Sequence, residues 1–191
     1  MTVAVDQPTI TFEQFLALSD SDEYELVEGR LVERKTMGVF ASYIATQIAT
    51  LLTLYCRDHK AGAVFGAETM YRCFGSPNTT RKPDVSFIRA GRLSAQHVGA
   101  GFFTLVPDLM VEVVSPNDLA YDLEEKLAAY DRVGVPLVWV VYPNTRRVHV
   151  IRADGTGAEL DEGDEIKDEP VLPGFACHVG DFFPPFPPLP E

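Results

Sequence analysis

Hydrophobic and polar residues recur with two different periods along the chain, and these periods predict the order of helices and strands. A three-to-four spacing of apolar residues is typical of helices. It occurs after the capping pair Thr11 and Gln14, from Gly38 to about His59 with a stop signal at Gly62, and over 119–134. A period of two on both sides of Glu28-Gly29 predicts a hairpin, with glycine at the positive-φ position of its turn.

Short apolar runs between turn residues predict the strands. Four of them are "AVFGAETMYRCF", "KPDVSFIRA", "PDLMVEVVS" and "PLVWVVYP", and the last is apolar throughout, as a strand covered on both faces is. The later segments "RRVHVIRADGTGAEL" and "EPVLPGFACHV" predict additional antiparallel strands. We therefore expect an α/β (α+β) fold in one domain over residues 1–183, followed by a proline-rich tail over 184–191.

Composition favours a globular protein without a membrane span. A hydrophobic share of 46% in 191 residues is enough for one core. Apolar runs stay well below ~18 residues, and the start "MTVAVDQPTI" lacks the regions of a secretion signal, so we expect a cytoplasmic location and no membrane partner. The three cysteines are odd in number and widely spaced, which fits neither a disulfide framework nor a zinc site.

Charge is unevenly distributed. The net charge of −12 argues against indiscriminate nucleic-acid binding, which needs many cations facing phosphates. Residues 154–169 hold eight acids and one lysine. Residues 72–92 instead hold five cations around the single acid Asp84. This basic neighbourhood is either a set of scattered surface arginines or the surroundings of a functional carboxylate.

Glu112 lies in the middle of an apolar run bounded by Pro107 and Pro116. Such a run is typical of a strand buried on both faces, so the carboxyl group should be largely out of water. A buried ionised carboxylate costs several kcal/mol unless it pairs with a cation, binds a metal or takes up a proton. The sequence therefore marks Glu112 as a candidate functional residue.

Two other residues can reach Glu112. The helix after this strand returns along the sheet, and seven residues of helix cover about the same 10 Å as three residues of strand, which places Lys126 level with Glu112. Asp84 follows Pro83 at the start of a strand that should pair beside the strand of Glu112. Two carboxylates and a lysine would suit a hard divalent cation such as Mg²⁺.

Five segments, in order, resemble the bacterial Uma-two family of restriction endonucleases. They are "YELVEGRLV", "KPDVSFI", "PDLMVEVVSPND", "EKLAAYDRVGVPLVWVVYP" and "RRVHVIR", and the resemblance spans about residues 11–183. The dipeptide Pro83-Asp84 followed by the strand acid Glu112 also resembles the wider PD-(D/E)xK nuclease superfamily. The resemblance implies a restriction-endonuclease-like core and a metal-dependent endodeoxyribonuclease that hydrolyses phosphodiester bonds.

The resemblance also implies roles for particular residues. Asp84 and Glu112 would hold Mg²⁺, for which Mn²⁺ substitutes, and the main-chain carbonyl of Val113 would add a ligand. The superfamily lysine belongs two residues after the acid, where this chain has Val114, and Lys126 matches the position to which that lysine has migrated in the Uma-two family.

Further expectations come from the same resemblance. Glu25 corresponds to another family carboxylate that would complete the metal's shell and join the catalytic residues. Arg81 and Lys82 would hold the DNA backbone, and a homodimer is implied because superfamily members commonly cut both strands as dimers. The family often has a histidine near the start of the long helix, where this chain has Ala41 and Ser42.

Simpler interpretations remain open for each residue. Glu112 and Lys126 would also form a purely structural ion pair, Asp84 a turn cap, and Lys126 a solvated partner of Asp122. Glu25 in an alternating hairpin is more often exposed than liganding. The alternative function is a catalytically inactive nuclease-fold protein that acts as a binding or regulatory module, which the acidity and the missing helix histidine favour.

Overall fold

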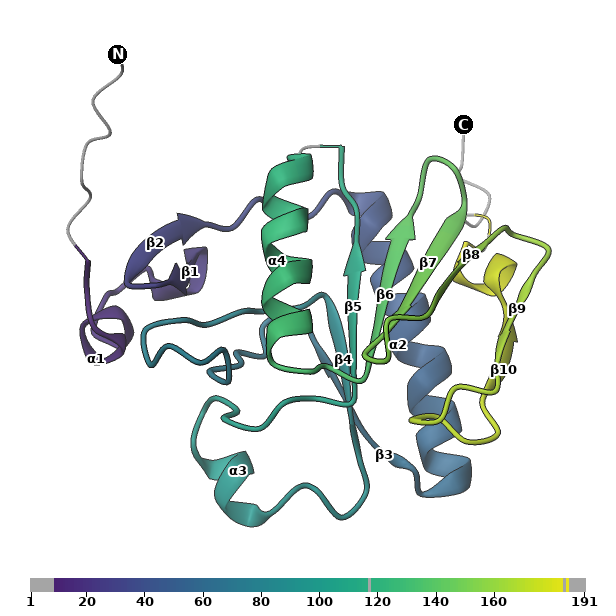
Figure 1. The fold of residues 1–191 in the computed structure, drawn as a ribbon, viewed down its shortest axis with the longest axis horizontal. Helices are drawn as coiled ribbons and strands as arrows, with labels where there is room; N and C mark the ends of the chain where they lie inside the picture. The colour runs from purple at the N-terminus through teal and green to yellow at the C-terminus, as the bar shows by residue number, and fades with distance from the viewer. Residues whose placement is uncertain (1–8, 117, 184, 186–191) are drawn as a thin grey trace, which may run out of the picture.

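A mixed six-stranded sheet forms the centre of the computed structural model, which describes residues 9–116, 118–183 and 185 (Figure 1). Across the sheet the strands follow the order β3, β4, β5, β6, β7, β8. Their bounds are Gly62–Gly66, Val85–Arg89, Leu109–Val113, Leu137–Tyr142, Arg147–Arg152 and Gly157–Leu160. Only β5 and β6 are parallel. A parallel neighbour needs a crossover connection, and α4 (Ala120–Arg132) supplies it.

Helices cover both faces of the sheet, as Figure 1 shows. The long helix α2 (Val39–His59) packs on one face, where Val111 and Val113 of β5 and Trp139 of β6 join its apolar side. The opposite face, which carries Met110, packs against α4 through Ala129 and Tyr130. Alternation along β5 therefore divides its side chains between two cores, and Glu112 lies on the α4 side.

Smaller elements complete the fold. Before α2 come α1 (Phe12–Leu16), the 3₁₀ turn η1 (Ser21–Glu23) and the hairpin of β1 (Tyr24–Val27) and β2 (Arg30–Glu33). The short helix α3 (Ala95–Gly99) lies in the connection between β4 and β5. After β8 come the separate two-stranded sheet of β9 (Glu165–Lys167) and β10 (Ala176–His178), and the turn η2 (Val179–Phe182).

Most predicted elements are confirmed. Thr11 and Gln14 form the expected capping box of α1. The hairpin turns at Glu28 and Gly29, and both residues, not glycine alone, have positive φ, of 51° and 81°. β6 is buried along almost its whole length, as its apolar run predicts. The predicted fold class, a central mixed sheet with flanking helices and extra antiparallel strands, is confirmed.

Three details at the element boundaries differ from the predictions. The run "AVFGAETMYRCF" is a strand only as far as Gly66, after which the chain turns, and Tyr71 makes isolated bridges with Arg81 and Phe103. α2 ends at His59, as predicted, but the left-handed residue that stops it is Lys60 and not Gly62, which opens β3. Within "EPVLPGFACHV" only the last residues pair as a strand. The predicted tail, apart from Pro185, lies outside the described residues.

α2 is the one helix among the described residues that is long and apolar enough to cross a membrane, with a mean hydropathy of 1.5. In this fold its apolar residues pack in the hydrophobic core. Ile44, Ile48 and Leu52 are fully buried against the sheet, as expected of a core helix in a globular domain.

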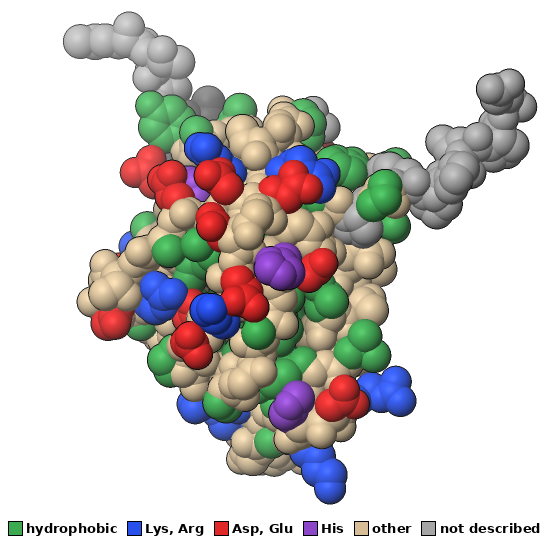
Figure 2. Space-filling view, turned by 90° about the vertical axis from the view of Figure 1, so that its right-hand side faces the viewer, with side chains coloured by type: hydrophobic (Ala, Val, Ile, Leu, Met, Phe, Trp, Pro, Cys, Tyr) green, Lys and Arg blue, Asp and Glu red, His purple; other side chains and the backbone are tan. Residues whose placement is uncertain are grey.

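The acidic segment 154–169 forms a surface of mixed charge, as Figure 2 shows for this side of the molecule. Arg147 of β7 binds Asp161, and Arg152 at the end of β7 binds the buried Glu169. Arg146 in the preceding turn binds Glu162. The excess of acids in this segment is therefore partly neutralised by the neighbouring hairpin.

Candidate active site

Asp84 and Glu112 lie beside each other on the α4 face of the sheet. β4 and β5 pair with Val85 opposite Val111 and Ser86 opposite Met110, and continuing this register by one residue brings Asp84 opposite Glu112. The Asp84 amide donates to the Val111 carbonyl at 3.1 Å, which extends the pairing to this position. Residues facing each other across a strand pair have Cβ atoms about 5 Å apart, so the two carboxyl groups share one environment.

Two residues of α4 bind Glu112, which is only 5% exposed. Lys126 Nζ donates to Glu112 Oε2 at 3.0 Å, and the Tyr130 hydroxyl donates to Glu112 Oε1. Lys126 and Tyr130 are four residues apart, so they lie on the same face of the helix. The predicted approach of Lys126 to Glu112 is confirmed, whereas the alternative partner of Lys126, Asp122, instead binds Lys35.

Asp84 keeps one oxygen for another partner. Its Oδ2 accepts a hydrogen bond from the Val113 amide at 2.6 Å. Burial and the negative charge of the facing Glu112 carboxylate raise the pKa of Asp84 to about 7. The hydrogen bond from the Val113 amide and the positive charge of Lys126 lower this pKa, but by less. When two carboxyl groups lie this close together with little water around them, ionisation of one makes ionisation of the other less favourable. A cation placed between them would relieve this repulsion.

The two α4 groups stay protonated around neutral pH. Burial disfavours the Lys126 ammonium, but the carboxylates of Glu112, Glu25 and Asp84 outweigh burial and raise its pKa above the ordinary value. Burial and the Glu112 carboxylate raise the pKa of the Tyr130 phenol well above its usual range. Lys126 is therefore a fixed positive charge and Tyr130 a fixed hydrogen-bond donor.

Glu25, Arg81 and Lys82 form a second polar cluster next to this pair. Glu25 is 3% exposed; its carboxylate accepts from Arg81 Nη1 at 2.9 Å and from the Lys82 amide at 2.7 Å. The Lys82 ammonium lies 3.4 Å from Asp22 Oδ1 and 3.7 Å from Glu68 Oε2. The cluster joins β1 to the segment that leads into β4, so it fixes the hairpin against the sheet.

All three side chains of this cluster are buried. Glu25 is buried although its alternating hairpin favoured an exposed position, because Arg81 reaches it from more than fifty residues away. Arg81 and Lys82 are themselves buried, so their proposed contact with DNA is limited to a substrate that enters the cavity they line. Arg81 Nε is buried without a hydrogen-bond partner among the described residues.

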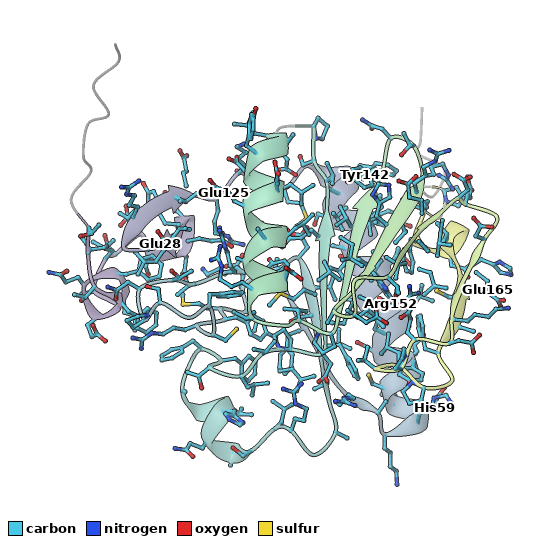
Figure 3. All side chains as sticks on the ribbon, viewed as in Figure 1. Glu28, His59, Glu125, Tyr142, Arg152 and Glu165 are labelled. Carbon is cyan, nitrogen blue, oxygen red and sulfur yellow. The ribbon has the colours of Figure 1, made fainter. Side chains whose placement is uncertain are left out.

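A cavity of about 770 Å³ lies between the β1–β2 hairpin, α2 and α4. Asp84, Glu112 and Lys126 line it together with Glu25. Ten acids and five cations contribute to its wall in total. One of the acids is Glu125 of α4, labelled in Figure 3 on the side toward the hairpin. An acidic wall repels a phosphate unless bound cations offset its charge.

The donor set fits a single hard cation. Among the described residues no group of three or more His, Cys, Asp or Glu side chains is arranged for a metal. Two carboxylates that face each other in a cavity, one with a free oxygen, still match Mg²⁺, which takes one or two carboxylates and retains water. Each Glu112 oxygen accepts one hydrogen bond and keeps a second lone pair for a ligand. The metal-ligand roles of Asp84, Glu112 and the Val113 carbonyl stay predictions.

Tyr130 is a site residue that sequence reasoning missed. It belongs to the apolar side of α4 and was therefore indistinguishable from core. Its position four residues after Lys126 was the available signal, because a helix that brings Lys126 to Glu112 also brings residue 130 to the same face.

One prediction concerns the metal-free protein. Folded Asp84 binds its proton up to a pKa of about 7, whereas an unfolded aspartate releases it near 3.8. Between these values the folded state binds more protons, so this residue lowers the free energy of unfolding as pH rises, by at most about 4 kcal/mol. We expect Asp84→Asn to gain stability over wild type between pH 4 and 7 in urea titrations. A constant difference across this range would contradict the raised pKa.

The fold and the site together define the class of protein. The mixed central sheet with helices on both faces is a restriction-endonuclease-like fold, and Asp84, Glu112 and Lys126 meet on one side of it. The chain belongs to the Uma2 family, whose description is "Putative restriction endonuclease" and whose family model matches residues 12–180. The predicted resemblance is confirmed.

A solved structure supports the fold. The crystal structure of "a putative nuclease belonging to DUF820 from Anabaena variabilis ATCC 29413" matches with a TM-score of 0.79 over 91% of this chain and 97% of that one. The two sequences are 19% identical, so this likeness shows the fold alone. No curated protein matches the chain.

Proposed function

We propose that this protein is a Mg²⁺-dependent endodeoxyribonuclease. The observation that carries the proposal is the Asp84–Glu112 pair, held side by side in a cavity wall with the Lys126 ammonium 3.0 Å from Glu112. A cation would stabilise two facing carboxylates of this kind, and Uma2 membership gives that cation a use in phosphodiester hydrolysis. Mn²⁺ is expected to substitute because it accepts the same oxygen ligands.

Each residue has a distinct part in the proposed reaction. Asp84 and Glu112 would hold the metal, with the Val113 carbonyl beside them. Mg²⁺ bound there supplies Lewis acidity toward the phosphate and activates water. Lys126 orients the attacking water or offsets the charge that develops on the phosphate, and it stays protonated while doing so. Glu25 orients Arg81, which lines the same cavity and has a buried Nε without a hydrogen-bond partner among the described residues.

The remaining parts of the proposal concern the surroundings of the reaction. The substrate is DNA, which would enter the cavity as a single strand or as a locally opened duplex, since Arg81 and Lys82 are buried residues that line the cavity. We also propose a homodimer, which would cut both strands, and a cytoplasmic location.

Cleavage of plasmid DNA tests the proposal. Wild-type protein with Mg²⁺ or Mn²⁺ should convert supercoiled plasmid to nicked or linear forms, and EDTA should stop the reaction. Both single-stranded and duplex oligonucleotides should be included, because the cavity favours unpaired strands. No cleavage of any of these DNAs at millimolar metal would contradict the proposal.

A second candidate function follows from the hydrogen bonds of Glu112. Lys126 and Tyr130 occupy both of its oxygens, which would also satisfy the carboxylate in a protein without a metal. In that case the chain would be an inactive nuclease-fold binding or regulatory module. Calorimetric titration with Mn²⁺ separates the two, because only the nuclease needs measurable metal affinity at millimolar concentration.

A further inference from the structure

The start of α2 and the hydroxyl group of Ser115 meet beside the cavity. α2 begins after Gly38, which has no side chain that could accept the amides of the first turn. A Cβ atom at Gly38 would lie 3.8 Å from Ser115 Oγ, so the hydroxyl lies against the helix start. Ser115 lines the cavity together with Lys35 and Met37, the residues that lead into α2.

The Ser115 hydroxyl is buried and unused. Ser115 is only 6% exposed, and its Oγ has no hydrogen-bond partner among the described residues. Its main-chain amide is already satisfied, because it donates to Asp118 Oδ2 at 2.7 Å. Proteins rarely leave a buried hydroxyl unpaired, since this costs about as much as a lost hydrogen bond. A ligand that enters the cavity would give it a partner.

The start of α2 favours an anion. A helix of 21 residues carries a partial positive charge at its amino terminus, and its first-turn amides suit phosphate oxygens. Lys35 lines the cavity nearby, with its ammonium paired to Asp122 at 2.8 Å. Asp122 offsets the charge of Lys35, and Asp118 accepts a hydrogen bond from the Ser115 amide, so the helix start is the remaining source of positive charge at this point.

We propose that Ser115 and the first turn of α2 form a phosphate-binding subsite next to the Asp84–Glu112 pair. The assignment of its ligand rests on the proposed nuclease function: the phosphate belongs to the DNA strand, beside the bond that is cut. Ser115 follows Glu112 by three residues, at most about 10 Å of chain, which neighbouring phosphates of one strand span. The same groups would accept a free phosphate or the phosphate of a nucleotide.

Two variants test the subsite: one removes a side-chain group from it and the other adds a carboxylate to it. Ser115→Ala removes only the unpaired hydroxyl, so its thermal midpoint should equal or exceed that of wild type. Gly38→Asp adds a favourable N-cap, since Gly38 has φ −62° and ψ 151° and room for a Cβ, and its carboxylate would occupy the site and repel an anion. Thr50→Ala is the matched control, because it removes an exposed hydroxyl from the same helix outside the cavity.

Binding is measured without catalysis. Inorganic phosphate is titrated into the metal-free protein and followed through the amide NMR signals of Val39 and Ala41; a short fluorescent DNA is titrated in Ca²⁺. We expect Ser115→Ala to weaken both interactions about fivefold or more and Gly38→Asp to weaken them further, with Thr50→Ala unchanged. This pattern, with thermal midpoints at or above wild type, excludes unfolding as the cause.

Each other outcome has a definite meaning. Phosphate binding that neither variant changes overturns the subsite, even if the protein cleaves DNA. Loss of phosphate binding alone, with DNA affinity intact, overturns the DNA assignment in favour of a free phosphate or nucleotide. A wild-type protein that cleaves no DNA but binds phosphate through Ser115 contradicts the nuclease proposal and supports the subsite.

Discussion

Replacement of Asp84 by asparagine should lower the rate of DNA cleavage about a thousandfold while the fold stays intact. Asparagine has the same shape and keeps an oxygen for the Val113 amide, so the 2.6 Å hydrogen bond can persist. What it removes is the negative charge that, with Glu112, would hold the metal. The loss of metal-dependent transition-state stabilisation is typically several kcal/mol, and each 1.36 kcal/mol is tenfold in rate.

The measurements are single-turnover cleavage at saturating Mg²⁺ and calorimetric titration with Mn²⁺. We expect both the rate and the Mn²⁺ affinity to fall together. Asp131→Asn is the control, because Asp131 is an exposed acid near the end of the same helix as Lys126, outside the cavity. Cleavage by Asp84→Asn at the wild-type rate would remove Asp84 from the proposed site.

Local patterns explain how much of this fold could be predicted. The helices and strands follow from period, because α2 and α4 each bury a stripe and β6 is covered on both faces. The meeting of Lys126 with Glu112 followed from element lengths alone, since strand and helix are joined by a short connection and must lie antiparallel.

Long-range pairings explain what could not be predicted. The register that brings Asp84 opposite Glu112 depends on how β4 and β5 pair across an irregular connection that contains α3, and local sequence leaves that register open. The burial of Glu25 and Arg81 depends on their meeting each other, and each looks like a surface residue when taken alone. The sequence shows which residues are charged, but it does not show which of them will be buried and paired with an opposite charge.

The absent helix histidine illustrates the same limit. The resemblance to the family implied a histidine near the start of the long helix, and this chain has Ala41 and Ser42 there. Met37 and Ser42, on either side of the start of α2, line the cavity, and Ser115, from a different segment of the chain, lies against Gly38 there. The loss of one polar side chain in the sequence therefore does not mean that this end of the cavity lacks polar groups.

Replacement of Lys126 by methionine should separate a catalytic role from a structural ion pair. Methionine fills a similar volume without charge, so Glu112 loses the ammonium at 3.0 Å but keeps the Tyr130 hydroxyl. If Lys126 assists the reaction, the cleavage rate should fall about a hundredfold, as it does when one charge-stabilising group is removed from a site. Thermal stability should fall only modestly, by about 2 kcal/mol, because the lysine side chain is 26% exposed.

The Mn²⁺ affinity of Lys126→Met shows whether a loss of cleavage comes from the missing ammonium or from a misfolded site. The ammonium now competes with a cation for the Glu112 carboxylate, so its removal should leave the Mn²⁺ affinity unchanged or increase it. A misfolded site would instead lose metal binding and cleavage together. Lys167→Met, which removes an exposed lysine on β9, should change neither quantity. If Lys126→Met cleaves DNA like wild type and differs only in stability, Lys126 is a structural partner of Glu112, and the general charge stabilisation proposed for it must come from Arg81 or the metal alone.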